Sequence, residues 1–254
     1  MIFETHAHYD DEAFDQDRDA LLSGIQKEGI GTIINVAADI KSVETSLKLS
    51  EQYDFIYAAV GIHPSETMEL NDDKMQWLKD QAQKKKVVAI GEIGLDYYWK
   101  EPEPMLQKKW FEQQLNLAKE VNKPVIIHSR DASADTLNIL CSREFDEISG
   151  VIHCYSYSLE TAKTYLKKNY YFGIGGVITF SNAKKLQEVV EYLPLDHILL
   201  ETDSPYLAPV PNRGKRNSSL NIPLIAEKIA QIKEITYDEV VEQTRQNAEK
   251  LFFG

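Results

Sequence analysis

The residues of this chain with the clearest capacity for chemistry are histidines and carboxylates that end short apolar runs. His6 and His8 close the first such run, in the stretch IFETHAHYDD that begins at Ile2. Residues two apart in an extended strand point to the same side, so these two imidazoles can reach one point. Converging imidazole nitrogens suit a divalent metal ion, although either histidine alone is equally consistent with an ordinary buried residue.

Further metal-ligating residue types stand in equivalent places along the chain. The candidates that follow later apolar runs are, in chain order, His63, Glu92, His128, His153, Glu201 and Asp203. Of the six histidines, only His197 precedes its run instead of following it. Zn²⁺, Mn²⁺, Co²⁺ and Mg²⁺ all accept ligands from this set of nitrogen and oxygen donors.

Each candidate also has an explanation that involves no metal. His63 precedes a proline and is compatible with a simple turn, and Asp203 in TDSP is compatible with a turn aspartate. The whole set is harder to explain in this way. Four histidines and two carboxylates exceed what one tetrahedral ion needs: His6, His8, His128, His153, Glu92 and Asp203. We therefore predict two divalent ions bridged by Glu92.

Eight apolar, β-branched runs must position these residues. They read IFET from Ile2, TIINVA from Thr32, IYAAVG from Ile56, VVAIGE from Val87, VIIH from Val125, VIHC from Val151, YFGIGG from Tyr171 and ILLET from Ile198. The runs are mostly continuous, as in parallel strands buried on both faces. Between and after these runs, apolar residues recur at the spacing of a helix. This pattern predicts clear helices over 15–29, 104–122, 221–235 and 236–253. Thr236 and Glu239 form an expected capping box.

Eight strands that alternate with helices predict a (β/α)8 TIM barrel, a single domain over residues 1–254. A doubly wound open sheet is the alternative, but no glycine-rich dinucleotide loop follows the first run. In a barrel of this kind, catalytic groups lie at the carboxyl ends of the strands, where the candidate ligands stand.

Composition limits the function classes. The net charge of −12 argues against a protein that coats nucleic acid by charge alone. The two cysteines, Cys141 and Cys154, form no CxxC pair, and Cys154 is expected to face away from His153 and serve packing. No run is long enough to span a membrane and no secretory signal is present, so we expect a cytoplasmic protein, with no obligate protein partner evident.

Eight motifs in order, from near residue 5 to near residue 217, resemble the TatD-type metal-dependent hydrolases, a branch of the amidohydrolase superfamily that includes DNases. They are THAHYDD, GIHP, GEIGLDYY, IIHSRDA, IHCYSYS, FGIGGVITF, ETDSPYLAP and RGKRN. The resemblance implies that His6, His8, Glu92 and Asp203 hold one metal. It implies that Glu92, His128 and His153 hold the other. His63 and Arg130 would then lie near a substrate phosphate.

The function that the resemblance implies is a deoxyribonuclease, acting as a 3′-to-5′ exonuclease on single-stranded DNA ends. Glu92 and Asp203 would be its catalytic residues, with Asp203 orienting or deprotonating the attacking water. The same site also suits an ester or amide hydrolase, such as a D-aminoacyl-tRNA deacylase. A metal-stabilised scaffold without activity is a third possibility, which the full ligand set disfavours.

Several neighbouring residues have predicted supporting roles. Glu201 is expected to hold a ligand histidine in its tautomer or, equally, to cap a neighbouring backbone group. Arg213 and Arg216 are candidates to bind phosphate, whereas Lys215 is expected to be solvated. Two departures from the family pattern put substrate preference in doubt: Tyr157 replaces a usual glycine, and Ser218 and Ser219 replace a usual Glu-Pro.

Overall fold

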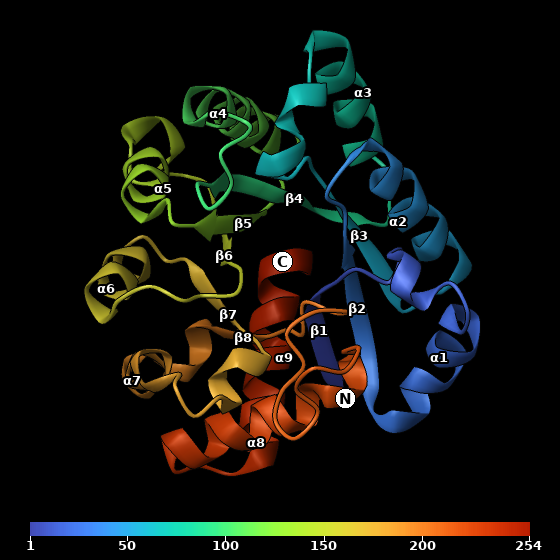
Figure 1. The fold of residues 1–254 in the computed structure, drawn as a ribbon, viewed down its shortest axis with the longest axis vertical. Helices are drawn as coiled ribbons and strands as arrows, with labels where there is room; N and C mark the ends of the chain where they lie inside the picture. The colour runs from blue at the N-terminus through green and yellow to red at the C-terminus, as the bar shows by residue number, and fades with distance from the viewer.

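Eight parallel strands surround a common axis, and helices cover the outside of the ring (Figure 1). The structure is a computed structural model and describes residues 1–254. The strands follow one another in the sheet in chain order, from β1 to β8, and every neighbouring pair is parallel. This order confirms the predicted TIM barrel and rules out the doubly wound open sheet, whose strand order reverses at a switch point.

The strands begin at or close to the predicted apolar runs. Their bounds are β1 Ile2–Ala7, β2 Ile30–Val36, β3 Ile56–Val60, β4 Val87–Asp96, β5 Val125–Arg130, β6 Gly150–Ile152, β7 Tyr171–Ile174 and β8 Ile198–Leu200. The strand β4 is buried along its whole length and continues past Glu92 to Asp96. It therefore places more of the chain inside the barrel than the sequence predicted.

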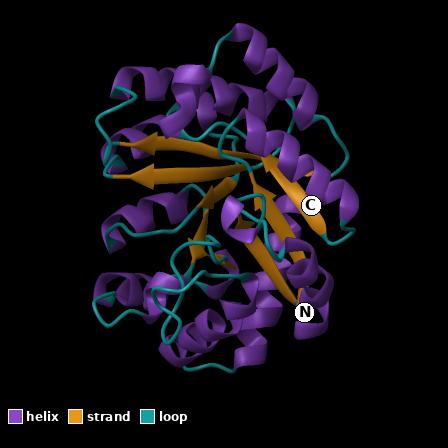
Figure 2. Ribbon diagram, turned by 45° about the vertical axis from the view of Figure 1, so that its right-hand side comes forward, coloured by secondary structure: helices purple, strands orange, loops and turns teal.

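The helices lie outside the strands (Figure 2). The α-helices are α1 Arg18–Ile25, α2 Ile40–Gln52, α3 Asp72–Ala82, α4 Pro104–Glu120, α5 Ser133–Leu140, α6 Leu159–Lys167, α7 Lys184–Tyr192, α8 Ile222–Lys233 and α9 Tyr237–Phe253. Short 3₁₀ helices are η1 Glu12–Phe14, η2 Gln26–Glu28, η3 Pro64–Glu69, η4 Arg143–Phe145, η5 Gly176–Thr179, η6 Leu195–His197 and η7 Ser219–Asn221. None of the helices has the length and apolar character that crossing a membrane requires.

The predicted helix over 15–29 is shorter in the structure. The α-helix spans only Arg18–Ile25, tightens into the 3₁₀ helix η2, and stops at Gly29, whose φ of 91° is left-handed. A left-handed residue ends a helix because its carbonyl can no longer continue the ladder, and glycine adopts that conformation without strain. The capping box of Thr236 and Glu239 at the start of α9 is confirmed.

The last helix closes the amino end of the barrel. Ala248, Leu251 and Phe252 of α9 pack in one apolar cluster with inward residues of the strands, and the rings of Phe3 and Phe252 stack 6.2 Å apart. Figure 1 shows the C-terminus near the centre of the ring of strands. This apolar plug leaves the carboxyl ends of the strands as the open side of the barrel.

The seam between β1 and β8 is held largely by side chains. The two strands share no regular ladder, and the backbone bonds across the seam lie beyond the end of β8, around an isolated bridge between Ala7 and Ser204. The buried carboxyl group of Glu4 spans the gap: its Oε1 accepts the N–H of Thr202 at 2.9 Å, and its Oε2 accepts the hydroxyl of Thr202 at 2.7 Å. The N–H of His6 also donates to Glu4 Oε1 at 3.2 Å. One side chain thus satisfies three buried donors, two of them across the seam.

Replacing Glu4 tests the seam. Burial raises the pKa of Glu4 to about 8, so the neutral amide of Gln is a close substitute. We expect Glu4→Gln to lower the free energy of unfolding by less than about 1 kcal/mol. Glu4→Leu leaves the three donors unpaired and should lower it by about 3 kcal/mol or more. Urea denaturation compares the two variants, and equal stability would contradict the role of Glu4.

Candidate metal centre

The predicted ligands from the two ends of the chain converge above the seam. The Nε2 atoms of His6 and His8 lie 3.1 Å apart, and Asp203 Oδ1 lies 3.8 Å from His6 Nε2 and 3.4 Å from His8 Nε2. Asp203 follows β8 in a left-handed conformation with φ of 58°, and its N–H donates to the carbonyl of His6 at 2.9 Å. Backbone contacts of this kind fix the carboxylate beside the two imidazoles.

Glu92 lies at the centre of the cluster, and its two oxygens face different histidines. Its Oε2 is 3.4 Å from His6 Nε2 and 4.0 Å from His8 Nε2. Its Oε1 is 2.7 Å from His128 Nδ1 and 3.8 Å from His153 Nε2. The carboxylate therefore joins the histidines at the end of β1 to those at the ends of β5 and β6.

Neighbouring oxygens orient the imidazoles toward this centre. His8 Nδ1 contacts the carbonyl of Val36 at 2.8 Å, which leaves Nε2 for the cluster. His128 has the opposite arrangement: Asp96 Oδ2 is 3.1 Å from its Nε2, and Nδ1 faces Glu92. Partners of this type fix the tautomer of a metal-ligating histidine. The sequence analysis did not identify Asp96 as a site residue, because it ended the fourth strand at Glu92.

Glu201 lies beside both of its predicted partners. Its Oε1 lies 3.1 Å from His153 Nδ1, and the same oxygen accepts the N–H of Cys154 at 2.6 Å. Gly173 on β7 makes room for this carboxylate, since a Cβ on Gly173 would lie 2.1 Å from Glu201 Oε2. Gly173, the first glycine of the FGIGG stretch, is thus required because the Glu201 carboxylate approaches its Cα closely.

The donor set suits a cation. His8 directs Nδ1 to the carbonyl of Val36, so its neutral form presents a lone pair on Nε2. The Nε2 of His6 lies 3.1 Å from this lone pair, and two nitrogens at this distance require a proton or a metal ion between them. The buried Nδ1 of His6 has no hydrogen-bond partner. Ligand atoms close enough to share an ion occur in three groups: His6, His8 and Asp203; His6, His153 and Glu201; and His63, Glu92 and His128.

The carboxylates and histidines of the cluster shift one another's pKa values. Burial acts to raise the pKa of Glu92, but His6, His128 and His153 hold it well below its usual range. Burial acts to lower the pKa of each histidine, yet neighbouring carboxylates raise it to about 9 for His8 and His128 and to about 10 for His153. In His6 burial prevails, aided by His153, and its pKa falls below the ordinary value.

His63 and Arg130 line the open pocket of about 680 Å³ above these ligands. Burial lowers the pKa of His63 to about 3, with a smaller effect from His128, so its ring is neutral. Its Nδ1 accepts the N–H of Ser65 at 3.2 Å, which places the ring proton on Nε2. Arg130 ends β5, is exposed, and lies over the ring of Tyr98 at 3.7 Å.

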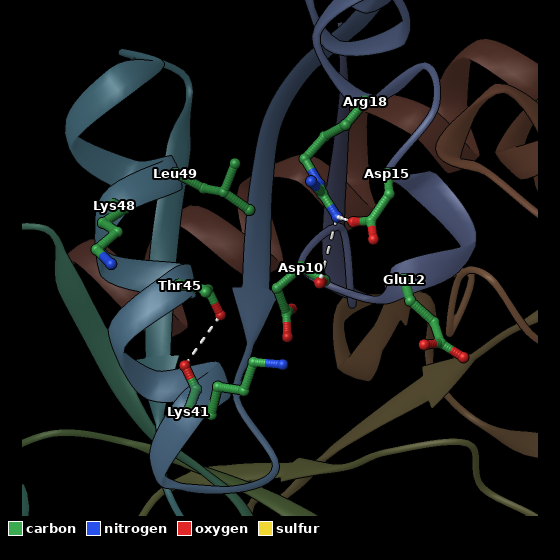
Figure 3. Close-up of a pocket in the computed structure, with 8 residues that line it drawn as sticks. All are labelled: Asp10, Glu12, Asp15, Arg18, Lys41, Thr45, Lys48 and Leu49. Atoms are coloured by element: carbon green, nitrogen blue, oxygen red, sulfur yellow. Dashed lines mark hydrogen bonds and ion pairs between the residues drawn. The ribbon is translucent and has the colours of Figure 1, made fainter.

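A smaller pocket of about 270 Å³ adjoins the first, between α2 and the loop after β1. Its lining residues are Asp10, Glu12, Asp15, Arg18, Lys41, Thr45, Lys48 and Leu49 (Figure 3). Arg18 and Asp15 pair with each other, 2.6 Å apart. Charges of both signs face this pocket, so it does not form a basic channel that leads to the ligands.

The arginines and lysine of RGKRN are not part of the pocket lining. Arg213 lies over the ring of Phe180 at 4.3 Å. Arg216 pairs with both carboxylate oxygens of Asp17 at 2.6 Å and fastens its loop to the segment before α1. Lys215 is exposed. The structure therefore brings Arg130 to the predicted ligands but leaves Arg213 apart from them.

The residues that depart from the family pattern have structural partners. The hydroxyl of Tyr157 is 2.9 Å from Ser129 Oγ and accepts the N–H of Ala132 at 3.3 Å, on either side of Arg130. Ser219 is buried, and its Oγ lies 2.8 Å from the hydroxyl of Tyr9. Tyr157 thus braces the loop after β5, and Ser219 belongs to the packing behind the seam.

Cys154 differs from its expected placement. Strand β6 ends at Ile152, and Cys154 has a left-handed φ of 45°, so the alternation of a strand does not extend to it. Burial raises the pKa of its thiol well above the usual range, and the carboxylates of Asp203 and Glu201 add to the effect. The prediction that Cys154 faces away from His153, which assumed a continuing strand, therefore loses its basis.

Comparison with known proteins identifies the family. The model of the family described as TatD related DNase matches residues 3–253. The chain belongs to the TatD family. Its fold and its ligand cluster are those of a metal-dependent hydrolase, whose buried histidines and carboxylates are able to bind metal.

Relatives of this TatD chain extend over its full length. An uncharacterized metal-dependent hydrolase of Bacillus subtilis, YabD, is 42% identical, with 99% of each chain covered. Another from Escherichia coli, YcfH, is 35% identical and covers 99% of this chain and 96% of its own. The crystal structure of the TatD homologue YjjV from Escherichia coli superposes with a TM-score of 0.93 at 32% identity, covering 100% and 98% of the two chains.

Substitution of Gly173 tests the support that Glu201 gives to His153. Gly173→Ala should displace the Glu201 carboxylate and weaken metal binding about tenfold or more. Gly175→Ala is the matched control, because the nearest atom to its added Cβ is 3.6 Å away. Metal titrations of both variants measure the difference. Unchanged affinity in Gly173→Ala, with an unchanged circular dichroism spectrum, would contradict the role of this glycine.

Metal binding should release protons at pH 7. The pKa values of His8, His128 and His153 lie at about 9 to 10 without metal, and an ion must displace these protons. Affinity should therefore increase as pH rises from 6 toward about 9. Titration calorimetry in buffers of different ionisation enthalpy detects the release, and Glu201→Gln should reduce it. An enthalpy that is the same in every buffer would rule the effect out.

Proposed function

We propose that this TatD-family hydrolase is a phosphodiesterase that removes nucleotides from single-stranded DNA ends in the 3′-to-5′ direction. Two divalent ions are its proposed cofactors, held by His6, His8, Glu92, Asp203, His128 and His153. The family description as DNase supports this substrate class.

The orientation of Glu92 is the observation that carries the proposal. One oxygen faces the pair His6 and His8, and the other faces His128 and His153. A carboxylate with its two oxygens directed to separate groups of nitrogens is arranged to bridge two ions. Two-ion sites are common in enzymes that cleave phosphodiesters, because both the attacking and the leaving oxygen need stabilisation.

The residues around the ligands have complementary proposed roles. When bound, two divalent ions would lower the pKa of an attacking water and neutralise charge on the phosphoryl oxygens. Asp203 orients this water and accepts its proton. Burial acts to raise its pKa, yet His8 and the neighbouring histidines hold it below the usual range, so the carboxylate is ionised at neutral pH. The Nε2–H of His63 and the guanidinium of Arg130 donate to the phosphate.

Asp203→Asn tests the proposed chemistry. We expect it to lower the rate of DNA shortening at least about 100-fold with the far-ultraviolet circular dichroism spectrum unchanged, because the amide cannot accept the proton. Asp131→Asn is the matched control: Asp131 is exposed, has a φ of 53° that Asn tolerates, and carries the same charge. The substrate is a short 5′-labelled single-stranded DNA, with Mg²⁺, Mn²⁺, Zn²⁺ or a chelator.

The pattern of products separates the candidate activities. A ladder of shortened DNA that both the chelator and Asp203→Asn abolish supports the exonuclease. Intact DNA in every metal, with release of an amino acid from D-aminoacyl-tRNA by the same preparation, would assign the site to deacylation instead. Near-wild-type rates for Asp203→Asn would refute its role in either reaction.

A further inference from the structure

Two exposed aromatic residues stand at the mouth of the pocket that holds the ligands. Trp99 and Tyr206 both line this pocket, and their exposed fractions are 58% and 53%. Trp110, by contrast, is 4% exposed and lies within the core. Large aromatic side chains lose favourable burial when they remain in water, so two of them at one entrance point to a surface that a ligand covers.

The topology sets the two aromatic residues on opposite sides of the entrance. Trp99 follows β4 and Tyr206 follows β8, and these strands are four positions apart in a barrel of eight. A ligand group that enters the pocket between the loops after these strands passes both rings. We refer to Trp99 and Tyr206 together as the aromatic entrance.

Both side chains have contacts that restrict their motion. The hydroxyl of Tyr206 donates to Asp11 Oδ2 at 2.8 Å, and its ring centroid is 6.4 Å from that of the predicted ligand His8. Trp99 packs edge-to-face on Tyr98, at 4.8 Å and 90°. A braced aromatic ring loses little conformational entropy when a ligand covers it.

A positively charged side chain, Arg130, belongs to the same group of contacts. The Tyr98 ring that supports Trp99 also carries the Arg130 guanidinium, 3.7 Å from the ring centroid. The entrance therefore joins flat aromatic surfaces to a residue suited to phosphate. A nucleotide combines the two matching groups, a planar base and a phosphate, whereas a plain phosphate ester offers only the second.

We propose that the aromatic entrance binds an unstacked nucleobase of the substrate, next to the phosphate that reacts. This inference rests on the proposed function and specifies its substrate: a nucleic-acid end whose terminal bases are unpaired. Stacking on an aromatic side chain contributes about 1–3 kcal/mol per base and tolerates every base. A paired base within a duplex has no free face for such a ring.

The test compares two single-stranded DNA ligands that have equal numbers of phosphates. One is a ten-residue phosphorothioate oligothymidine, which resists cleavage, and the other has abasic tetrahydrofuran residues in place of its three terminal nucleosides at each end. Fluorescence anisotropy of an internally labelled strand measures the Kd for the metal-loaded protein. We expect the wild type to bind the base-bearing strand about tenfold more tightly.

Variants assign this preference to the entrance. Trp99→Ala should lose most of the tenfold preference and leave the affinity for the abasic strand unchanged, and Trp99→Phe should keep most of it. Tyr192→Ala is the matched control, since Tyr192 on α7 is 49% exposed and does not line the pocket. Equal affinity for the two strands in the wild type, or a loss for both strands in Trp99→Ala, would overturn the inference.

The outcomes for the entrance and for the nuclease are distinguishable. A protein that shows the base-dependent preference but cleaves no DNA retains the aromatic entrance and loses the proposed exonuclease activity. A protein that shortens DNA without any preference for the base-bearing strand retains the exonuclease and loses the entrance.

Discussion

The molecule is organised around one buried carboxylate, Glu92, that must remain ionised inside the barrel. Burial acts to raise its pKa, and only the surrounding imidazoles reverse that effect. Each of these imidazoles comes from a different place in the chain: β1, β5 and the end of β6. The barrel satisfies this requirement because it brings the carboxyl ends of distant strands to one point. The apolar cluster that α9 forms with the strands lies at the amino end of the barrel. The carboxyl end is therefore free for polar groups.

Much of the cluster could be predicted from the sequence because the ligands follow strands, and buried parallel strands have a strong apolar pattern. The rule that catalytic groups lie at strand ends then selects His6, His8, Glu92, His128 and Asp203 without knowledge of their distances. Two other carboxylates were not predictable in this way. Asp96 lies in a strand that continues beyond its apolar run, and Glu4 bonds Thr202, just after β8, in a contact between the two ends of the chain that no spacing records.

Residues in the long loops were the least predictable. Arg213 and Arg130 have the same charge, and sequence offers no means to tell which one reaches the ligands. In the structure Arg213 stacks on Phe180, whereas Arg130 extends a strand and so shares its direction with His128. Trp99 and Tyr206 likewise resemble any aromatic residues until the positions of β4 and β8 are known. Loop conformation depends on contacts between segments far apart in the chain, and these leave no periodic signal.

The incomplete seam of the barrel gives the metal centre a mechanical consequence. His6 belongs to β1, His8 follows it directly, and Asp203 follows β8, so the predicted ligands of one ion come from the two sides of the seam. An ion held by all three would fasten the first strand to the last at the point where backbone pairing is sparse. Binding of such an ion would then be linked to closure of the barrel, because a ligand that binds only the closed form stabilises it. At this position, an ion would serve the stability of the fold as well as the chemistry.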